Sequence, residues 1–413
     1  METPLLVRPE NSGESPAAVP VSTVDSRSLS AEFPEFRGKR FLFAAGHFDY
    51  FSGAERQAVY FAGELVKQLQ ADVKFIGWGG NGRFADEIRA VGACPIVFPY
   101  NLDMSLWQNR RVLISLARSV RRDLAPDFLL PYVSPHCRIL GLIWPWTGAS
   151  FCWWNQRDEG RGITGTLLDH YLIRSLPAII SNSWEGRDFL NKRFRLAPNR
   201  VKVINNGVAL PAILSEKSWR KKTGIPENAF VISMIATLSR FKDHETLMRA
   251  FAEVFRRLPG RDLRLILAGP HGDRLNHVRS VSAELNMEDS ILTPGEVTDI
   301  ESLIRSTDLV VHSSTTEGCP NGVLEPMAHG LCVLGTDISG LRQALGAETA
   351  GDCLAPPQDW RCLAEKILQR IQNPEQRFAE GQRNRQRIRL NFSISGMAHE
   401  CLAAIRDEIG SQN

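Results

Sequence analysis

The sequence predicts an α/β protein built from two doubly wound domains, and three observations support this fold class. The chain has 413 residues, more than one hydrophobic core usually accommodates. From Arg40 onward, short strand-like runs rich in β-branched and aromatic residues alternate with amphipathic segments of helix length, as in parallel sheets covered by helices on both faces. A polar passage over residues 210–228 interrupts this alternation, which then restarts. Two such sheets are therefore expected.

The expected strands follow from the apolar runs and the turn residues that bound them. In the first half they cover residues 41–46, 73–77, 95–99, 128–133, 150–155, 178–181 and 201–205. In the second half they cover residues 231–238, 263–269, 309–313 and 333–336. The first domain is expected over residues 39–207 and the second over residues 208–390.

The two ends of the chain lie outside the alternation of strands and helices. Residues 1–38 begin with a stretch rich in Pro, Ser and Glu that has no periodicity, so a flexible leader is expected there. Residues 391–413 carry apolar side chains at helical spacing, namely Met397, Cys401, Leu402, Ile405 and Ile409. They predict a helix, which either caps the second domain or crosses back to the first.

Composition narrows the class of protein. Hydrophobic residues make up 43% of the chain and charged residues 23%, so a packed, water-soluble protein is expected. The net charge of +3 argues against a dedicated nucleic-acid-binding protein. The eight cysteines are scattered without zinc-ligand or redox spacing, which favours buried thiols and a cytoplasmic location. No apolar run approaches the roughly 20 residues needed to span a bilayer.

The most informative segment covers residues 313–325. A strand ends at Ser313, a loop rich in Ser, Thr, Gly and Pro follows, and a helix is expected to begin near Asn321. Free amides at a helix N-terminus form a site for a diphosphate. Glu317 and Glu325 flank this point, and because carboxylates repel phosphate we expect them to accept hydrogen bonds from sugar hydroxyls. The alternative is that both are solvated acids that stabilise the helix dipole.

This segment resembles a known family. The run Glu317-Gly-Cys-Pro-Asn-Gly-Val-Leu-Glu325-Pro-Met-Ala-His-Gly330 is similar to the signature of the retaining glycosyltransferases of family 4, which have the GT-B fold of two Rossmann-like domains facing across a cleft. Other segments resemble further landmarks of that family in the right order: residues 52–56, 181–183, 204–208, 236–247, 265–269, 294–297 and 333–340. Their joint order is more specific than any single piece.

The resemblance implies a role for each matching position. Glu325 would accept hydrogen bonds from the donor ribose, and Glu317 would hold hydroxyls of the transferred sugar. Lys242 would neutralise charge as the nucleoside diphosphate leaves. Backbone groups complete the donor site: the amides of Asn321, Gly322 and Val323 would face the diphosphate, Gly295 and Val297 would lie in the base-binding loop, and Gly53 would admit the first-domain backbone.

The sequence also departs from the family pattern. The family usually places an arginine five residues before the lysine, where this chain has Thr237. Arg240, two residues before Lys242, is a candidate for the missing cation, and an exposed loop arginine is the alternative. A single lysine grips phosphate less firmly than an Arg/Lys pair, since arginine offers a two-pronged donor.

A second candidate segment follows a first-domain strand, where many relatives carry a histidine near the reacting sugar. Residues 153–161 contain none. Asn155, Arg157 and Asp158 are the candidates for sugar or acceptor contacts, with Asp158 also placed among the catalytic residues. The alternative is a salt-bridged loop that packs the tryptophans of this segment.

Neither a metal nor a further cofactor is expected. No Asp-x-Asp follows a strand, and no His, Cys and carboxylate cluster has ligand spacing. Cationic side chains and helix amides would then stabilise the leaving group. The basic helix expected over residues 109–124 carries Arg110, Arg111, Arg118, Arg121 and Arg122. It would contact an anionic membrane peripherally or form a solvated face.

Together these observations predict a retaining glycosyltransferase. It would move a hexose-type sugar from a UDP- or GDP-sugar to a saccharide or lipid-linked saccharide acceptor, in polysaccharide or glycoconjugate biosynthesis. Two alternatives stay open: a non-catalytic GT-B protein that binds a nucleotide sugar or a partner, and a nucleotide-sugar epimerase.

Overall fold

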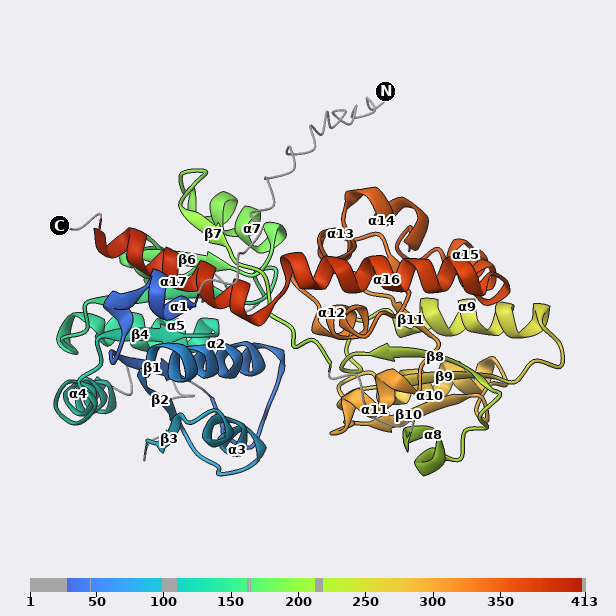
Figure 1. Cartoon of the computed structure of the whole chain (residues 1–413), viewed down its shortest axis with the longest axis horizontal. Coiled ribbons are helices and arrows are strands. Elements are labelled where there is room, and N and C mark those ends of the chain that lie inside the picture. The colour runs from blue at the N-terminus through green and yellow to red at the C-terminus, as the bar shows by residue number, and fades with distance from the viewer. Residues whose placement is uncertain are drawn as a thin grey trace, which may run out of the picture.

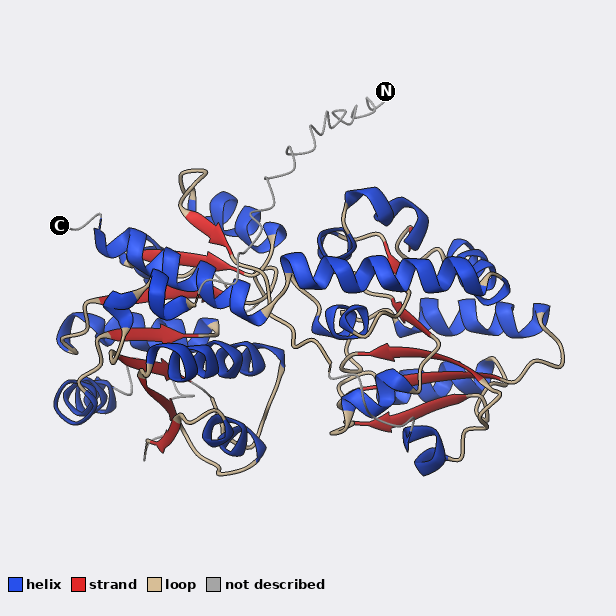
Figure 2. Cartoon of the chain, viewed as in Figure 1, coloured by secondary structure: helices blue, strands red, loops and turns tan. Residues whose placement is uncertain are grey.

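The computed structural model describes residues 28–44, 46–98, 110–161, 163, 165–211 and 218–410. These residues form two α/β domains that lie side by side, each with one parallel sheet between layers of helices (Figures 1 and 2). The predicted fold class is confirmed. Residues 1–27 of the expected leader lie outside the described residues.

The described part of the first domain contains a seven-stranded parallel sheet with the order β3-β2-β1-β4-β5-β6-β7. The strands are β1 Arg40–Ala44, β2 Asp72–Gly77, β3 Cys94–Val97, β4 Phe128–Pro131, β5 Phe151–Gln156, β6 Ala178–Ser181 and β7 Val201–Val203. The order reverses between β1 and β4, and ligands bind at such a switch point, beyond the carboxyl ends of the strands.

Helices cover both faces of this sheet, because side chains on a strand alternate between the faces. Phe41 and Phe43 of β1 pack in one buried cluster with α2 and the last helix, α17, whereas Leu42 and Ala44 pack in another cluster with α4 and α5. The helices of this domain are α1 Leu29–Glu32, α2 Gly53–Leu69, α3 Arg83–Ala90, α4 Arg110–Ser119, α5 Ser134–Ile143, α6 Leu167–Ser175, α7 Trp184–Phe194 and α17 Ile394–Gly410.

The final helix, whose destination the sequence left open, lies against the first domain. Figure 1 shows α17 beside α2 and β6, far from the second sheet. Its apolar stripe, including Met397, Leu402 and Ile405, is buried in the same cluster as Phe43 and Phe61. The last helix thus completes the core of the first domain.

The N-terminal boundary is corrected by the structure. The flexible leader was expected to reach residue 38, yet Leu29, Phe33 and Phe36 are almost fully buried. They belong to α1 and the short helix Pro34–Phe36. The ring of Phe33 packs edge-on against His399 of α17 at a centroid distance of 5.1 Å. Burial of three large apolar side chains orders this segment, although it is too short to show periodicity.

Within the described residues, the second domain has a six-stranded parallel sheet with the order β10-β9-β8-β11-β12-β13. The strands are β8 Phe230–Ile235, β9 Leu263–Ala268, β10 Ile291–Gly295, β11 Leu309–His312, β12 Val333–Thr336 and β13 Leu354–Ala355. The helices are α8 Ser218–Thr223, α9 His244–Arg257, α10 Leu275–Glu284, α11 Ile300–Arg305, α12 Asn321–Ala328, α13 Ser339–Leu345, α14 Ala347–Cys353, α15 Trp360–Gln372 and α16 Pro374–Asn391.

Every predicted strand overlaps an observed one, and two edge strands were missed. β10 contains Pro294, which the sequence placed in a loop. An edge strand tolerates proline because one side of its backbone has no partner strand. β13 has only two residues, too few for a recognisable pattern.

The chain passes between the domains twice, at neighbouring places. The amide of Val208 donates a hydrogen bond to the carbonyl of Phe392 (2.8 Å), and Val208 forms a parallel β-bridge with Ser393. The two passages therefore run side by side. In the described part of the chain, no helix is long and apolar enough to cross a membrane.

Candidate active site in the interdomain cleft

Two adjoining cavities lie between the carboxyl ends of the two sheets. Their volumes are about 300 Å³ and 410 Å³. They share part of their lining: Gly53, Ile235, Ala236, Thr237, Asn321 and Gly322. They therefore form one continuous cleft. The first cavity extends from this shared part toward Glu317, and the second extends toward Glu325 and Val297.

The shared part of the cleft brings α12, α2 and the end of β8 into close contact. α12 begins at Asn321, as predicted. A Cβ atom at Gly322 would overlap the backbone oxygen of Ile235, so only glycine fits here. At Gly53, the first residue of α2, a Cβ atom would lie 2.8 Å from Nδ2 of Asn321. That same Nδ2 donates a hydrogen bond to the Gly53 carbonyl oxygen (3.3 Å).

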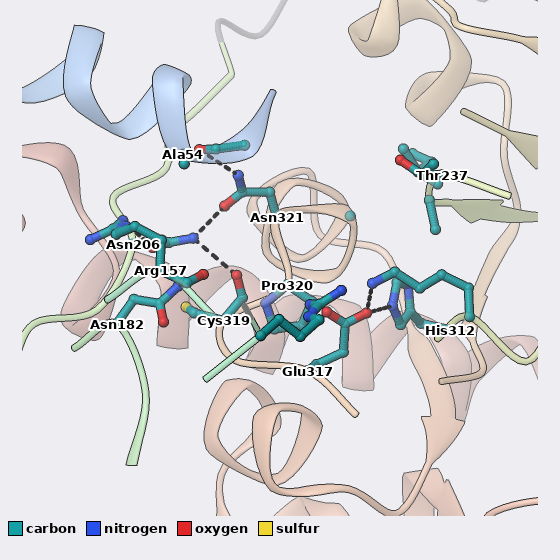
Figure 3. Close-up of a pocket in the computed structure, with 16 residues that line it drawn as sticks. Ala54, Arg157, Asn182, Asn206, Thr237, His312, Glu317, Cys319, Pro320 and Asn321 are labelled. Carbon is teal, nitrogen blue, oxygen red and sulfur yellow. Dashed lines mark hydrogen bonds and ion pairs between the residues drawn. The ribbon is translucent and has the colours of Figure 1, made fainter. Parts of the chain in front are cut away.

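Glu317 is held by three side chains in the first cavity, and Figure 3 shows its contact with His312. Its carboxylate forms an ion pair with Lys242. It also accepts hydrogen bonds from His312 Nε2 (2.8 Å) and Ser314 Oγ (2.9 Å). Burial holds the pKa of His312 well below its usual range, so the ring is neutral and its proton lies on Nε2. Glu317 is only 5% exposed and is fixed in position by its own domain.

Lys242 has an unusual environment for a lysine. Burial, the largest effect, and the nearby Arg161 guanidinium together lower its pKa to about 7, although the Glu159 carboxylate opposes them. Lys242 therefore lies close to its titration midpoint at neutral pH, and an anion bound beside it would raise its pKa.

The first domain contributes its own polar groups to this cavity from the loop after β5 and the loop after β7. Arg157 donates a hydrogen bond from Nη2 to Asn206 Oδ1 (2.5 Å), and its guanidinium lies 5.3 Å from the Tyr132 ring centroid. Asn206 Nδ2 donates to Asn321 Oδ1 (2.7 Å) and to the Cys319 carbonyl (2.9 Å) (Figure 3). These bonds join the domains at the base of the cavity.

Glu325 dominates the second cavity. Burial raises the pKa of the Glu325 carboxyl above its usual range, and an ion pair with Arg56 of α2 only partly offsets this rise. The partner of Glu325 thus comes from the opposite domain. Val297 and Glu296, just after β10, line the far end of this cavity with Gly269.

The structure brings together many of the sequence-predicted site residues. The cleft is lined by Glu317, Lys242, Glu325, Arg157, Gly53, Val297, Asn321 and Gly322. Gly295 lies just outside the lining, where its carbonyl accepts a hydrogen bond from the Gly269 amide (2.9 Å). The predicted role of Val323 is corrected, because its side chain is fully buried in the second-domain core and its amide donates a hydrogen bond to the Pro320 carbonyl (3.0 Å).

Three other predicted residues lie apart from the lining of the two cavities. Asn155 is 1% exposed within β5. Asp158 accepts hydrogen bonds from Gln156 and from the Gly160 amide, and burial raises its pKa. Arg240 stacks 4.9 Å from the Phe241 ring and lines, with Arg274, a neighbouring pocket that meets the first cavity only at Lys242. Arg240 is close to Lys242 in sequence, but the structure does not place Arg240 beside Glu317.

Sequence reasoning missed four residues at the cleft: Arg161, His312, Asn206 and Arg56. Each lies in or beside a segment that had been recognised. His312 is the last residue of β11, directly before the loop that holds Glu317. Arg161 lies four residues after Arg157 in the loop that follows β5. A histidine at the end of an apolar strand and a second arginine after one strand were the available signals.

In the described ranges, no group of three or more His, Cys, Asp or Glu side chains is placed to hold a metal ion.

Two Rossmann-like domains that face each other across a cleft define the GT-B fold. Residues 215–387 match the family Glycosyl transferases group 1, so the second domain is a glycosyl transferases group 1 domain. This match confirms the resemblance found in the sequence. The chain is also 27% identical over 224 residues to D-inositol 3-phosphate glycosyltransferase of Saccharomonospora viridis. That alignment covers 52% of each protein, so the chain spans about half the length of this curated relative.

Solved structures extend the similarity to both domains. HepE of Anabaena, crystallised in complex with UDP and glucose, superposes with a TM-score of 0.76 at 17% identity and covers 89% of this chain and 100% of its own. A glycosyltransferase from Rickettsia africae superposes with a TM-score of 0.75 at 18% identity and covers 90% and 98%. At these identities the likeness establishes the fold alone.

Proposed function

We propose that this chain is a retaining, metal-independent glycosyltransferase that moves a hexose-type sugar from a UDP- or GDP-sugar to a saccharide or lipid-linked saccharide. One observation carries the proposal: the two cavities meet at the N-terminus of α12, so one extended ligand reaches both Glu325 and Glu317. A nucleotide sugar has the matching order of groups. Its nucleoside would lie toward Glu325, its diphosphate beside α12 and its sugar toward Glu317.

The nucleoside end would be recognised mainly by Glu325 and the backbone near β10. The Glu325 carboxylate would accept hydrogen bonds from the ribose hydroxyls, displacing Arg56. Backbone groups around Gly295 and Val297 would meet the base. HepE was crystallised with UDP, which makes UDP-sugars the first donors to test.

The diphosphate would lie on the amides of Asn321 and Gly322, beside Lys242, because the Val323 amide already donates a hydrogen bond to the Pro320 carbonyl (3.0 Å). Helix amides and a buried cation stabilise an anion strongly in a site of low dielectric constant. As the bond between sugar and phosphate breaks, charge develops on the leaving oxygen next to the lysine. Protonated Lys242 would neutralise it, which supports a leaving-group mechanism without a metal.

The sugar would lie against Glu317, which accepts hydrogen bonds from its hydroxyls. Of the described residues that line the first cavity, Glu317 is the single carboxylate. Lys242, His312 and Ser314 all contact its Oε1, so Oε2 stays available to accept hydrogen bonds from the sugar. As the family resemblance implies, the acceptor would attack on the face from which the diphosphate leaves, with the leaving phosphate taking the acceptor proton and the anomeric configuration retained.

A surface of the first domain supports a lipid-linked acceptor. A groove of about 600 Å³ runs between α4 and the end of α5, lined by Leu113, Ile114 and Trp146. Arg110, Arg118 and Arg121 line it too, and Trp146 is 61% exposed. Arg111 and Arg122 extend the positive charge of the same segment. Arginines beside exposed apolar side chains suit the interface of an anionic membrane.

This surface leads to a proposed location at the inner face of the cytoplasmic membrane. All eight cysteines are free thiols, as in a reducing compartment. Flotation with phosphatidylcholine vesicles, with and without phosphatidylglycerol, tests the contact. We expect binding only to the anionic vesicles, and we expect replacement of the three groove arginines by glutamine to abolish it.

Donor turnover is the decisive test of the proposed function. The protein is incubated in EDTA with UDP-glucose, UDP-galactose, UDP-N-acetylglucosamine or GDP-mannose, and the sugar is followed by proton NMR. We expect one donor to release its nucleoside diphosphate, with the first-formed product keeping the anomeric configuration. Conversion to an isomeric nucleotide sugar without release would indicate an epimerase, and binding without turnover a non-catalytic protein.

A further inference from the structure

The cations of the first cavity are distributed unevenly between the domains. Of its described lining residues, the second domain supplies one cation, Lys242, whereas the first domain supplies two, Arg157 and Arg161. Thr237 occupies the second-domain wall where the two cavities join. Its hydroxyl adds no charge at the point where a diphosphate would lie.

Arg161 reaches across the cleft to the second domain. Its guanidinium lies 4.6 Å from the ring centroid of Phe241, the residue directly before Lys242. Glu159 orients it by accepting hydrogen bonds from Nε (2.9 Å) and Nη2 (3.2 Å). Nη1 is thereby left available for a ligand. The positive charge of Arg161 also lowers the pKa of Lys242, as expected for two cations close together.

Arg157 has no acidic partner. None of the ion pairs among the described residues includes it, and its buried Nε lacks a hydrogen-bond partner. A guanidinium partly removed from water without a counter-ion is costly unless an anion joins it. Asn206 and Tyr132 hold it in place on one side, and the cavity lies on the other.

We propose that Arg157 and Arg161 bind the donor diphosphate from the first domain and form with Lys242 a split clamp that exists only when the domains are closed. This inference rests on the proposed function, since it assumes a nucleotide-sugar donor. It assigns to the first domain the second and third cations of the phosphate site. The diphosphate would then draw the two domains together by bridging them.

Binding of nucleotides to the full-length protein tests the split clamp. The probe is whichever of UDP, GDP and ADP binds the wild type by calorimetry, compared with its nucleoside, which lacks the phosphates. We expect Arg157→Gln and Arg161→Gln each to weaken diphosphate binding about tenfold, as for loss of a charge-assisted hydrogen bond. Binding of the nucleoside should not change, which also shows that each variant is folded.

Two further variants make the test specific. Arg240→Gln is the matched control, because Arg240 is near Lys242 but outside the cavity, and it should bind the diphosphate like the wild type. Thr237→Arg, introduced into the Arg161→Gln protein, should restore most of the lost affinity by placing a cation on the opposite wall.

The outcomes separate this inference from the proposed function. If the wild type binds none of the three diphosphates, the proposed function fails and the split clamp with it. If the wild type binds one of them and both arginine variants bind it equally well, the split clamp alone is overturned. Loss of binding in Arg240→Gln but not in Arg161→Gln would return the second cation to Arg240.

Discussion

The two carboxylates that flank the start of α12 are held in different ways. Glu317 is fixed by Lys242, His312 and Ser314, all of the second domain. Glu325 is paired with Arg56 of the first domain. The first environment is therefore preorganised before any ligand arrives, whereas the second depends on how the domains are placed. Under the proposed function, this difference suits chemistry at the end of the cleft near Glu317 and exchange of the nucleoside at the end near Glu325.

The largest expected effect comes from removing the charge at the preorganised end. Glu317→Gln keeps the shape but weakens the acceptor for sugar hydroxyls and leaves Lys242 without its counter-ion. We expect kcat for donor turnover to fall about 10²–10³-fold, with nucleoside diphosphate affinity within about threefold of wild type. Steady-state rates together with calorimetry measure both. A parallel loss of rate and affinity would show that Glu317 serves binding instead.

At the other end, the expected loss is in affinity. Glu325→Ala removes the proposed ribose acceptor, and we expect diphosphate binding to weaken about 10–100-fold. At a ligand concentration of about ten times the wild-type Kd, most of the ligand-induced rise in melting temperature should disappear, because the stabilisation grows as the logarithm of one plus the ligand concentration over Kd. Thermal shifts with the preferred nucleoside diphosphate measure this. An unchanged shift would place the ribose elsewhere.

The titration of Lys242 predicts how binding depends on pH. Its pKa of about 7 in the free protein rises when a diphosphate lies beside it, so binding takes up a proton at and above pH 7. Affinity should then fall as the pH rises above 7, by up to about tenfold per unit. Calorimetry at pH 8 in buffers of different ionisation enthalpy detects the uptake.

A matched variant isolates this titration. Lys242→Arg keeps the positive charge but does not titrate, so proton uptake from this position should vanish. If the uptake persists in Lys242→Arg, another group is responsible for it.

The smallest expected effect tests the pairing across the domains. Arg56→Gln frees Glu325 for the ribose, and we expect nucleoside affinity to rise about three- to tenfold. The ligand-free protein should lose about 1–3 kcal/mol of unfolding free energy, since a buried carboxylate loses its partner. Chemical denaturation and nucleoside calorimetry report the two quantities. Weaker nucleoside binding would instead give Arg56 a direct role in holding the ligand.

Sequence predicted well those features that depend on local pattern. Buried parallel strands are recognisable in the sequence as apolar runs. The polar loop that ends at the start of a helix indicated the positions of Glu317, Asn321 and Glu325. Contacts within one strand–loop–helix unit follow from its sequence order. Most of the second-domain half of the candidate site was therefore foreseeable, whereas His312 was missed and Arg240 lies outside the lining of the two cavities.

What sequence did not predict depends on packing between distant segments. Arg161 reaches Phe241, and Arg56 reaches Glu325, only because the domains face each other at one particular angle. The ring of Phe33 packs against His399 of α17, a helix that lies far later in the chain. Arg240 was proposed because it is close to Lys242 in sequence, and Arg161 was not considered. Nothing in a single segment encodes these contacts.

The return of α17 to the first domain also bears on how the protein is made. A ribosome releases the chain from its N-terminus, and domains usually fold in that order. Here Leu402 and Ile405, which fill the core beside Phe61, follow the whole second domain in the chain. The first domain must therefore wait, with an apolar groove uncovered, while the second domain is translated. Of these two domains, the one that is synthesised earlier completes its core later.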